Sequence, residues 1–86
     1  MSNLKITLEV LKELVIANTN VKPEIKKVYI DYGSRWMEYT LVASSPTDSN
    51  ISYQMLSPRD IMDLNKGIFT VEDAQNFIDE INKRGW

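Results

Sequence analysis

The sequence predicts a single α+β domain spanning residues 1–86, in the order α-β-β-β-α-α. A three-stranded antiparallel β-meander is expected to pack against an N-terminal helix and two C-terminal helices. Three observations support this class. Two runs rich in β-branched and aromatic residues flank Gly33-Ser34 within residues 27–43, which is typical of a hairpin. Residues 51–56 alternate apolar and polar side chains, as a third strand does. The flanking segments carry the apolar spacing and the start residues of helices.

The composition limits how this chain is stabilised. Its 86 residues include no cysteine and no histidine, which excludes disulfides and any thiolate or imidazole metal site. A domain of this size buries only about 60–65% of its unfolded surface, so we expect a very well-packed core or a homodimer. The net charge of −2 indicates neither a phosphate-binding protein nor a bulk mimic of DNA.

The composition also bears on location. There is no signal-peptide pattern, and no stretch approaches the roughly 18 apolar residues that a membrane span needs. Together with the absence of cysteine, this predicts a cytoplasmic protein that does not contact a membrane.

Residues 3–18 carry two competing patterns. Leucine and valine recur at helical spacing from Leu8, which predicts a helix over most of the stretch with Asn3 or Thr7 as its N-cap. Apolar and polar residues also alternate from Leu4 to Val10, so a short strand before Thr7 is the alternative. The apolar arc of the helix covers roughly 200°, against the ~100° that one packed face needs. Either the C-terminal helices or an N-terminal strand cover the remainder, or a dimer or partner does.

The hairpin determines which side chains share a face. We expect Gly33-Ser34 to form a two-residue type II′ loop, with Tyr32 opposite Arg35. One set of side chains then faces the core: Val28, Ile30, Tyr32, Arg35, Met37, Tyr39, Leu41 and Ala43. The other side carries Tyr29, Asp31, Trp36, Glu38, Thr40 and Val42. A slip of one residue would exchange the two sides.

Two helices are predicted after the third strand. The first has Ser57 as its N-cap and Pro58 at its first position, and it runs to about Lys66 before Gly67. The second begins at Thr70-Val71 and ends at Gly85, with an apolar stripe made of Ala74, Phe77, Ile78 and Ile81. Trp86 either folds back onto this helix or projects into a partner, and the first arrangement is favoured.

No pattern in the sequence predicts an enzyme or a cofactor. A histidine base and a cysteine nucleophile are both missing, and Gly33, Gly67 and Gly85 are too isolated to form a phosphate-binding loop. Asp60 and Asp63 have a spacing that suits a shared Mg²⁺ ion, but such pairs are typical of a solvated helix face. We therefore expect no catalytic residue, no cofactor and no metal.

The predicted order of elements resembles that of the double-stranded-RNA-binding domain. The resemblance is one of topology alone, and it makes nucleic-acid binding the alternative function. That family contacts phosphates from the lysine-rich start of its last helix. The matching positions here are residues 58–60 or 71–73, which carry Asp60, Glu72 and Asp73 and would repel phosphate.

The hairpin supplies the candidate contact surface. The predicted partner-binding residues are Tyr29, Asp31, Tyr32, Arg35, Trp36 and Glu38, and they include the types enriched at binding hot spots. The alternative is that helices cover both faces of the sheet and that Tyr29 and Trp36 belong to the core. We predict a non-enzymatic protein-binding module, a small accessory protein with a regulatory or inhibitory role, acting as a homodimer. Its size and lack of motifs are typical of phage and mobile-element proteins.

Overall fold

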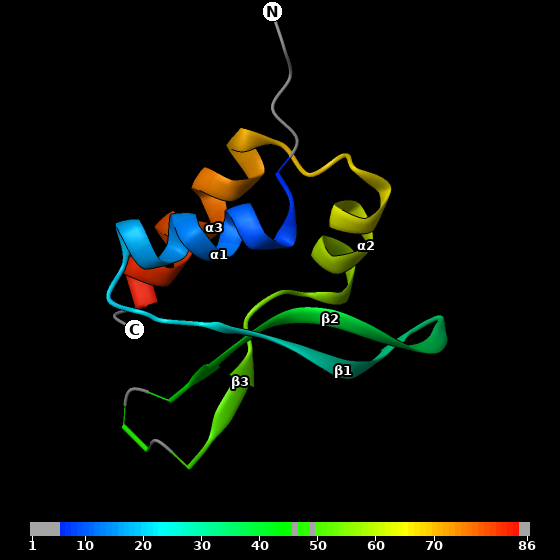
Figure 1. The fold of residues 1–86 in the computed structure, drawn as a ribbon, viewed down its shortest axis with the longest axis horizontal. Helices are drawn as coiled ribbons and strands as arrows, with labels where there is room; N and C mark the ends of the chain where they lie inside the picture. The colour runs from blue at the N-terminus through cyan, green and yellow to red at the C-terminus, as the bar shows by residue number, and fades with distance from the viewer. Residues whose placement is uncertain (1–5, 46, 49, 85–86) are drawn as a thin grey trace, which may run out of the picture.

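The computed structural model describes residues 6–45, 47–48 and 50–84 and has the predicted α-β-β-β-α-α order. The strands form one antiparallel sheet in the order β1-β2-β3. In Figure 1 the three helices lie on one side of this sheet. The elements are α1 (Leu8–Asn18), β1 (Glu24–Tyr32), β2 (Ser34–Ser44), β3 (Ser52–Gln54), α2 (Pro58–Lys66) and α3 (Val71–Arg84). The α+β class is thus confirmed.

The first helix begins at Leu8, directly after Thr7, which is one of its two predicted N-caps. The Thr7 hydroxyl accepts a hydrogen bond from the backbone N–H of Val10 at 3.2 Å, and the backbone of Thr7 itself is extended. Ile6 and Thr7 belong to neither a helix nor a strand. The other candidate cap, Asn3, and most of the alternative N-terminal strand lie in residues 1–5, outside the described residues.

The C-terminal helices lie where their end residues predict. Ser57 accepts a hydrogen bond from the N–H of Asp60 at 3.2 Å, and Gly67 closes α2 in the left-handed region at φ 72°. At the start of α3, the Thr70 hydroxyl accepts from the N–H of Asp73 and the Asp73 carboxylate accepts from the N–H of Thr70, each at 3.0 Å. Gly85 and Trp86 lie outside the described residues, so the roles predicted for them stay predictions.

The hairpin turns at a single residue, and here the sequence prediction is wrong. Tyr32 is paired with Ser34, and Gly33 alone forms the apex with φ 73°, in place of a two-residue Gly33-Ser34 loop. Ile30 therefore lies opposite Trp36 instead of Met37. Because side chains alternate along a strand, this shift exchanges the faces of β2 relative to β1.

Partway along the hairpin, the buried side chains change from even-numbered to odd-numbered residues. The change occurs at the same level on both strands. Near the turn, the buried or half-buried side chains are even-numbered: Val28, Ile30, Trp36, Glu38 and Thr40. Farther from the turn they include the odd-numbered Ile25, Leu41 and Ala43. The register between β1 and β2 is continuous through this point, so the change follows from twist and from the placement of the helices.

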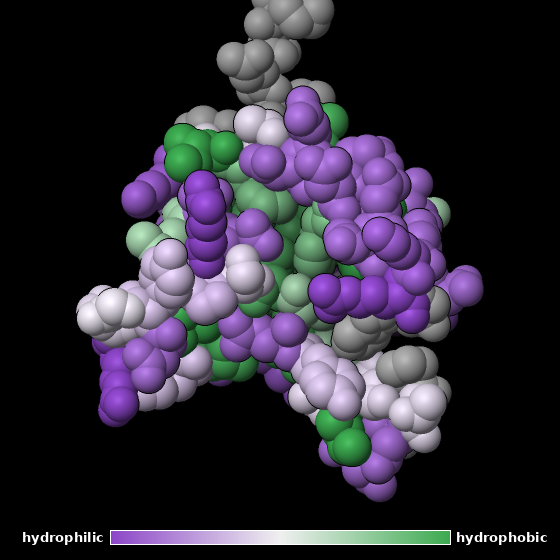
Figure 2. Space-filling view, turned by 180° about the vertical axis from the view of Figure 1, so that it is seen from behind, coloured by the Kyte–Doolittle hydropathy of each residue, from purple (hydrophilic) through white to green (hydrophobic). Residues whose placement is uncertain are grey.

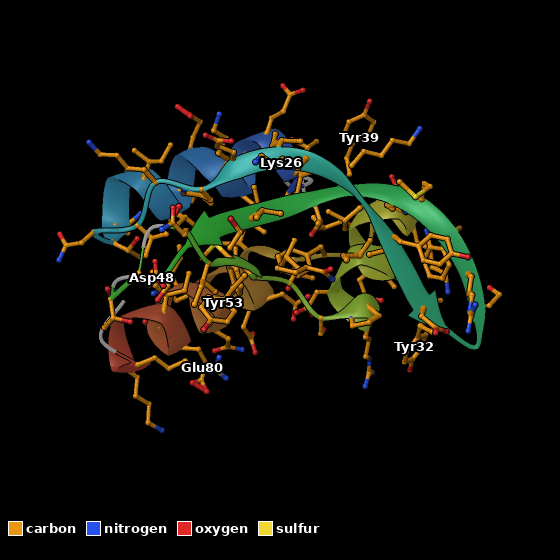
Figure 3. All side chains as sticks on the ribbon, turned by 90° about the horizontal axis from the view of Figure 1, so that it is seen from below. Lys26, Tyr32, Tyr39, Asp48, Tyr53 and Glu80 are labelled. Atoms are coloured by element: carbon orange, nitrogen blue, oxygen red, sulfur yellow. The ribbon has the colours of Figure 1, made fainter. Side chains whose placement is uncertain are left out.

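In Figure 1, α2 lies nearer the turn and α1 nearer the start of β1, and the twist of the hairpin turns a different one of its faces toward the helices at each end. α2 contacts β1, and its Asn65 donates a hydrogen bond to Glu38 of β2 in the half near the turn. α1 contacts both β1 and β2 and also packs against α3. Figures 1 and 3 show the strong twist, with β1 and β2 crossing in projection. Each half of the hairpin is left with one face that no described helix covers.

The core lies between the helices and the covered parts of the sheet. Its largest fully buried apolar side chains come from four elements, with two on α1: Leu11, Val15, Ile30, Leu41 and Ile61. On α1 the adjacent apolar positions are only partly covered, and Val10 and Ile16 remain 42% and 38% exposed. α3 supplies part of the cover that the wide apolar arc of α1 requires.

Candidate protein-contact surface

The half of the hairpin near Gly33 exposes a row of six side chains on the face away from α2. These residues, which we call the tip face, are Lys27, Tyr29, Asp31, Arg35, Met37 and Tyr39, and all six are exposed. They share a face because the odd-numbered residues of the two strands lie opposite one another in the observed register. The single-residue turn at Gly33 thus determines which side chains form this surface.

The tip face consists of three cross-strand pairs. Lys27 lies opposite Tyr39, with its ammonium nitrogen 5.7 Å from the ring centroid. Tyr29 lies opposite Met37 in the middle. At the turn, Asp31 lies opposite Arg35, and the Arg35 Nε atom is 3.4 Å from an Asp31 carboxylate oxygen.

The pairs stabilise an exposed surface without burying it. Cross-strand pairs contribute roughly 0.2–1 kcal/mol each, and an exposed ion pair is at the low end of that range. Exposure of the central side chains stays high, at 59% for Tyr29, 50% for Met37 and 54% for Tyr39. An apolar centre bordered by charges at both ends is the arrangement found in protein interfaces.

Three of the six predicted contact residues lie on the tip face: Tyr29, Asp31 and Arg35. Tyr32 is 51% exposed, but it belongs to the opposite side of the hairpin. In Figure 3, Tyr39 and Tyr32 project to opposite sides.

Trp36 and Glu38 are not on the tip face, contrary to the predicted pairing with Asp31 and Tyr29. Trp36 is partly buried and packs against the core. Glu38 is half-buried, and its carboxylate accepts a hydrogen bond from the Asn65 side chain of α2 at 2.6 Å. Both follow from the register shift, which turns the even-numbered residues of β2 toward α2.

Sequence reasoning did not include Lys27, Met37 and Tyr39 in the contact surface. Met37 and Tyr39 were expected in the core, where the two-residue loop would have placed them. The one signal that identifies them is the turn itself, because a loop of Gly33 alone assigns both to the face of Tyr29.

The described residues contain no cluster of three or more acidic, histidine or cysteine side chains able to hold a metal ion. Among the same residues, no helix has the length and apolar character to cross a lipid bilayer. Comparisons of this chain with protein-family models, with curated proteins and with solved structures gave no match.

Proposed function

We propose that this chain is a non-enzymatic protein-binding module that contacts its partner through the tip face. One observation carries the proposal: Tyr29, Met37 and Tyr39, each at least half exposed, adjoin one another on a sheet face. Large apolar side chains grouped in this way are typical of an interaction site. Tyrosine and methionine are also enriched at interfaces.

The size of the apolar centre indicates how the partner must bind. A tyrosine buries about 150–250 Å² when fully enclosed, so covering the exposed parts of Tyr29 and Tyr39 removes roughly 200 Å² from water. At about 25 cal/mol per Å² this gives ~5 kcal/mol. Association itself costs about 4–15 kcal/mol. A stable complex therefore needs contacts beyond these two side chains, from Met37 and from the pairs at both ends of the tip face.

The charges of the tip face favour a protein over a nucleic acid. Phosphate binding depends on cations that are free to neutralise it, whereas Arg35 is already paired with Asp31. The start of α3 adds Glu72 and Asp73, where the double-stranded-RNA-binding domain carries lysines.

A second copy of the chain is the first partner to test. Charges of both signs occur on the tip face, with Lys27 at one end and the Asp31–Arg35 pair at the other. Two tip faces related by a two-fold axis can therefore set Lys27 of one copy near Asp31 of the other. We propose a homodimer of this kind, with the same surface available to a regulatory or inhibitory target.

Sedimentation velocity over a range of protein concentrations tests this proposal. The wild-type chain is expected to form dimers, and Tyr29→Ala is expected to weaken them by about tenfold or more, as loss of a hot-spot residue does. Tyr32→Ala is the matched control, because Tyr32 is similarly exposed on the other side of the hairpin.

A parallel capture of proteins from cell lysate, with the same two variants, tests a different partner. Loss of a captured protein with Tyr29→Ala but not with Tyr32→Ala supports the tip face. If neither association nor capture responds to Tyr29→Ala, the tip face is not the contact surface. Salt-sensitive retention on a polyanion column, unaffected by Tyr29→Ala, would instead favour the nucleic-acid alternative.

A further inference from the structure

A second concave surface lies away from the tip face, between α3 and the segment that joins β3 to α2. It encloses about 370 Å³ and shares no residue with the tip face. That volume is at the lower end of the ~300–1,000 Å³ of typical ligand sites. Figure 2, which shows the molecule from behind, has apolar surface between polar borders on this side.

α3 forms one wall of this groove with a stripe of regularly spaced side chains. Asp73, Phe77, Glu80 and Arg84 line the groove at intervals of four, three and four residues, so they share one face of the helix. The buried stripe of α3 (Ala74, Ile78 and Ile81) lies beside it. A rise of 1.5 Å per residue separates the backbone positions of Asp73 and Glu80 by about 10.5 Å along the axis.

The lining combines apolar side chains with acids. Half-buried Met55 and Phe77 line the groove together with the buried Ile81. Asp60 of α2 and Asp73 and Glu80 of α3 line it as well. A groove lined by buried and half-buried apolar side chains and by acids suits an occupant that is itself amphipathic.

The electrostatic balance of the groove is negative. Its lining has three carboxylates and one cation, Arg84. Within the part of the chain that the structure describes, the two ion pairs are Lys26–Glu24 and Arg35–Asp31, and neither involves the groove. The Asp73 carboxylate accepts a hydrogen bond from the N–H of Thr70 at 3.0 Å. Asp60 and Asp73 also lie in first helical turns, where the helix dipole partly offsets their charge.

Glu80 is different from the other two acids. It lies in the middle of α3, beyond the first turn and before the last, so the dipole offsets its charge little. An uncharged apolar occupant would desolvate this carboxylate without compensation, which is unfavourable. A cationic side chain beside Glu80 would compensate that loss.

From the groove and its charge we infer that it binds a short cationic amphipathic segment of a partner protein. Apolar side chains of the segment pack on Met55 and Phe77, and a lysine or arginine lies beside Glu80. The ~10.5 Å between Asp73 and Glu80 equals about two turns of a helix or three residues of an extended strand. A segment with basic residues at either spacing meets both acids. This site is separate from the tip face and does not depend on its role.

Selection from a random 12-residue peptide display library tests the inference. The immobilised targets are the wild-type chain, Glu80→Lys and Asp79→Lys. The last is the matched control, because Asp79 is exposed on the same helix and does not line the groove. Both variants change the net charge equally, so non-specific attraction affects both alike. We expect wild type and Asp79→Lys to enrich the same peptides, with two lysine or arginine residues three or seven positions apart and with leucine, methionine or phenylalanine between them.

The enriched peptide is then synthesised and titrated into ¹⁵N-labelled protein. We expect amide shifts to concentrate at Asn76, Phe77 and Glu80, and affinity to fall at least tenfold in Glu80→Lys but less than twofold in Asp79→Lys. The inference is overturned if no peptide is enriched, if the enriched peptides lack basic residues, or if Glu80→Lys binds them as wild type does. Shifts centred on Tyr29 and Tyr39 would also overturn it, while leaving the tip face supported.

Discussion

Thr40 provides a direct test of how the core is organised. Its side chain is fully buried at the point where the buried residues of β2 change from even-numbered to odd-numbered, and within the described residues its hydroxyl has no hydrogen-bond partner. A buried polar group left without a partner costs about 1–3 kcal/mol of stability. Thr40→Val replaces that hydroxyl by a methyl group of similar size. We therefore expect the free energy of unfolding to rise by about 1–2 kcal/mol.

Thermal and urea unfolding measure the change. For a domain of this size, 1 kcal/mol corresponds to a shift of about 4–8 °C in Tm, so Thr40→Val is expected to melt at a clearly higher temperature. Thr40→Ser is the matched control, because it keeps the hydroxyl and removes the methyl group. We expect it to lose ~1 kcal/mol through the space it leaves. A Thr40→Val variant no more stable than wild type would refute the reasoning, because the hydroxyl would then not be an uncompensated cost.

Three further predictions concern the helix ends and one tertiary hydrogen bond. Thr7→Ala removes the N-cap of α1 and is expected to lower the free energy of unfolding by about 1 kcal/mol in urea titrations, while Thr7→Ser has little effect. Gly67→Ala places a Cβ at φ 72° and is expected to cost ~1–2 kcal/mol, with Gly67→Asn costing less in the same titrations. A double-mutant cycle on Glu38→Ala and Asn65→Ala is expected to give a coupling of about 0.5–1.5 kcal/mol. A coupling near zero would mean that this hydrogen bond does not help to hold α2 against the sheet.

The helix boundaries were predictable because each depends on a few neighbouring residues. Ser57, Pro58 and Gly67 identify the start and end of α2, and the structure has them as cap, first residue and left-handed terminator. Thr7, one of the two predicted N-caps of the first helix, likewise acts locally, through its hydrogen bond with the N–H of Val10. Signals of this kind require no knowledge of how distant segments pack.

The exposed face of the hairpin was not predictable in the same way. Both a one-residue and a two-residue turn fit the sequence around Gly33, since either uses the positive φ that glycine tolerates. The two turns differ by one residue in register, and that difference decides whether Tyr29 lies beside Met37 or beside Glu38. The alternation of apolar and polar residues cannot distinguish the two turns, because it relates residues within one strand and says nothing of which residues face each other across the hairpin.

The change from even-numbered to odd-numbered buried residues near Thr40 explains why the spacing of apolar residues could not identify the buried face of β2. A strand with one buried face shows apolar residues at every second position, but β2 buries even-numbered residues near the turn and odd-numbered ones beyond it. Its apolar residues therefore fit neither face along the whole strand. A hairpin whose twist turns different faces toward α2 and toward α1 produces this mixed pattern, and it leaves Tyr29, Met37 and Tyr39 on the uncovered side near the turn. This arrangement makes the buried face of β2 hard to predict from the sequence, and it also leaves Tyr29 and Tyr39 exposed for contact.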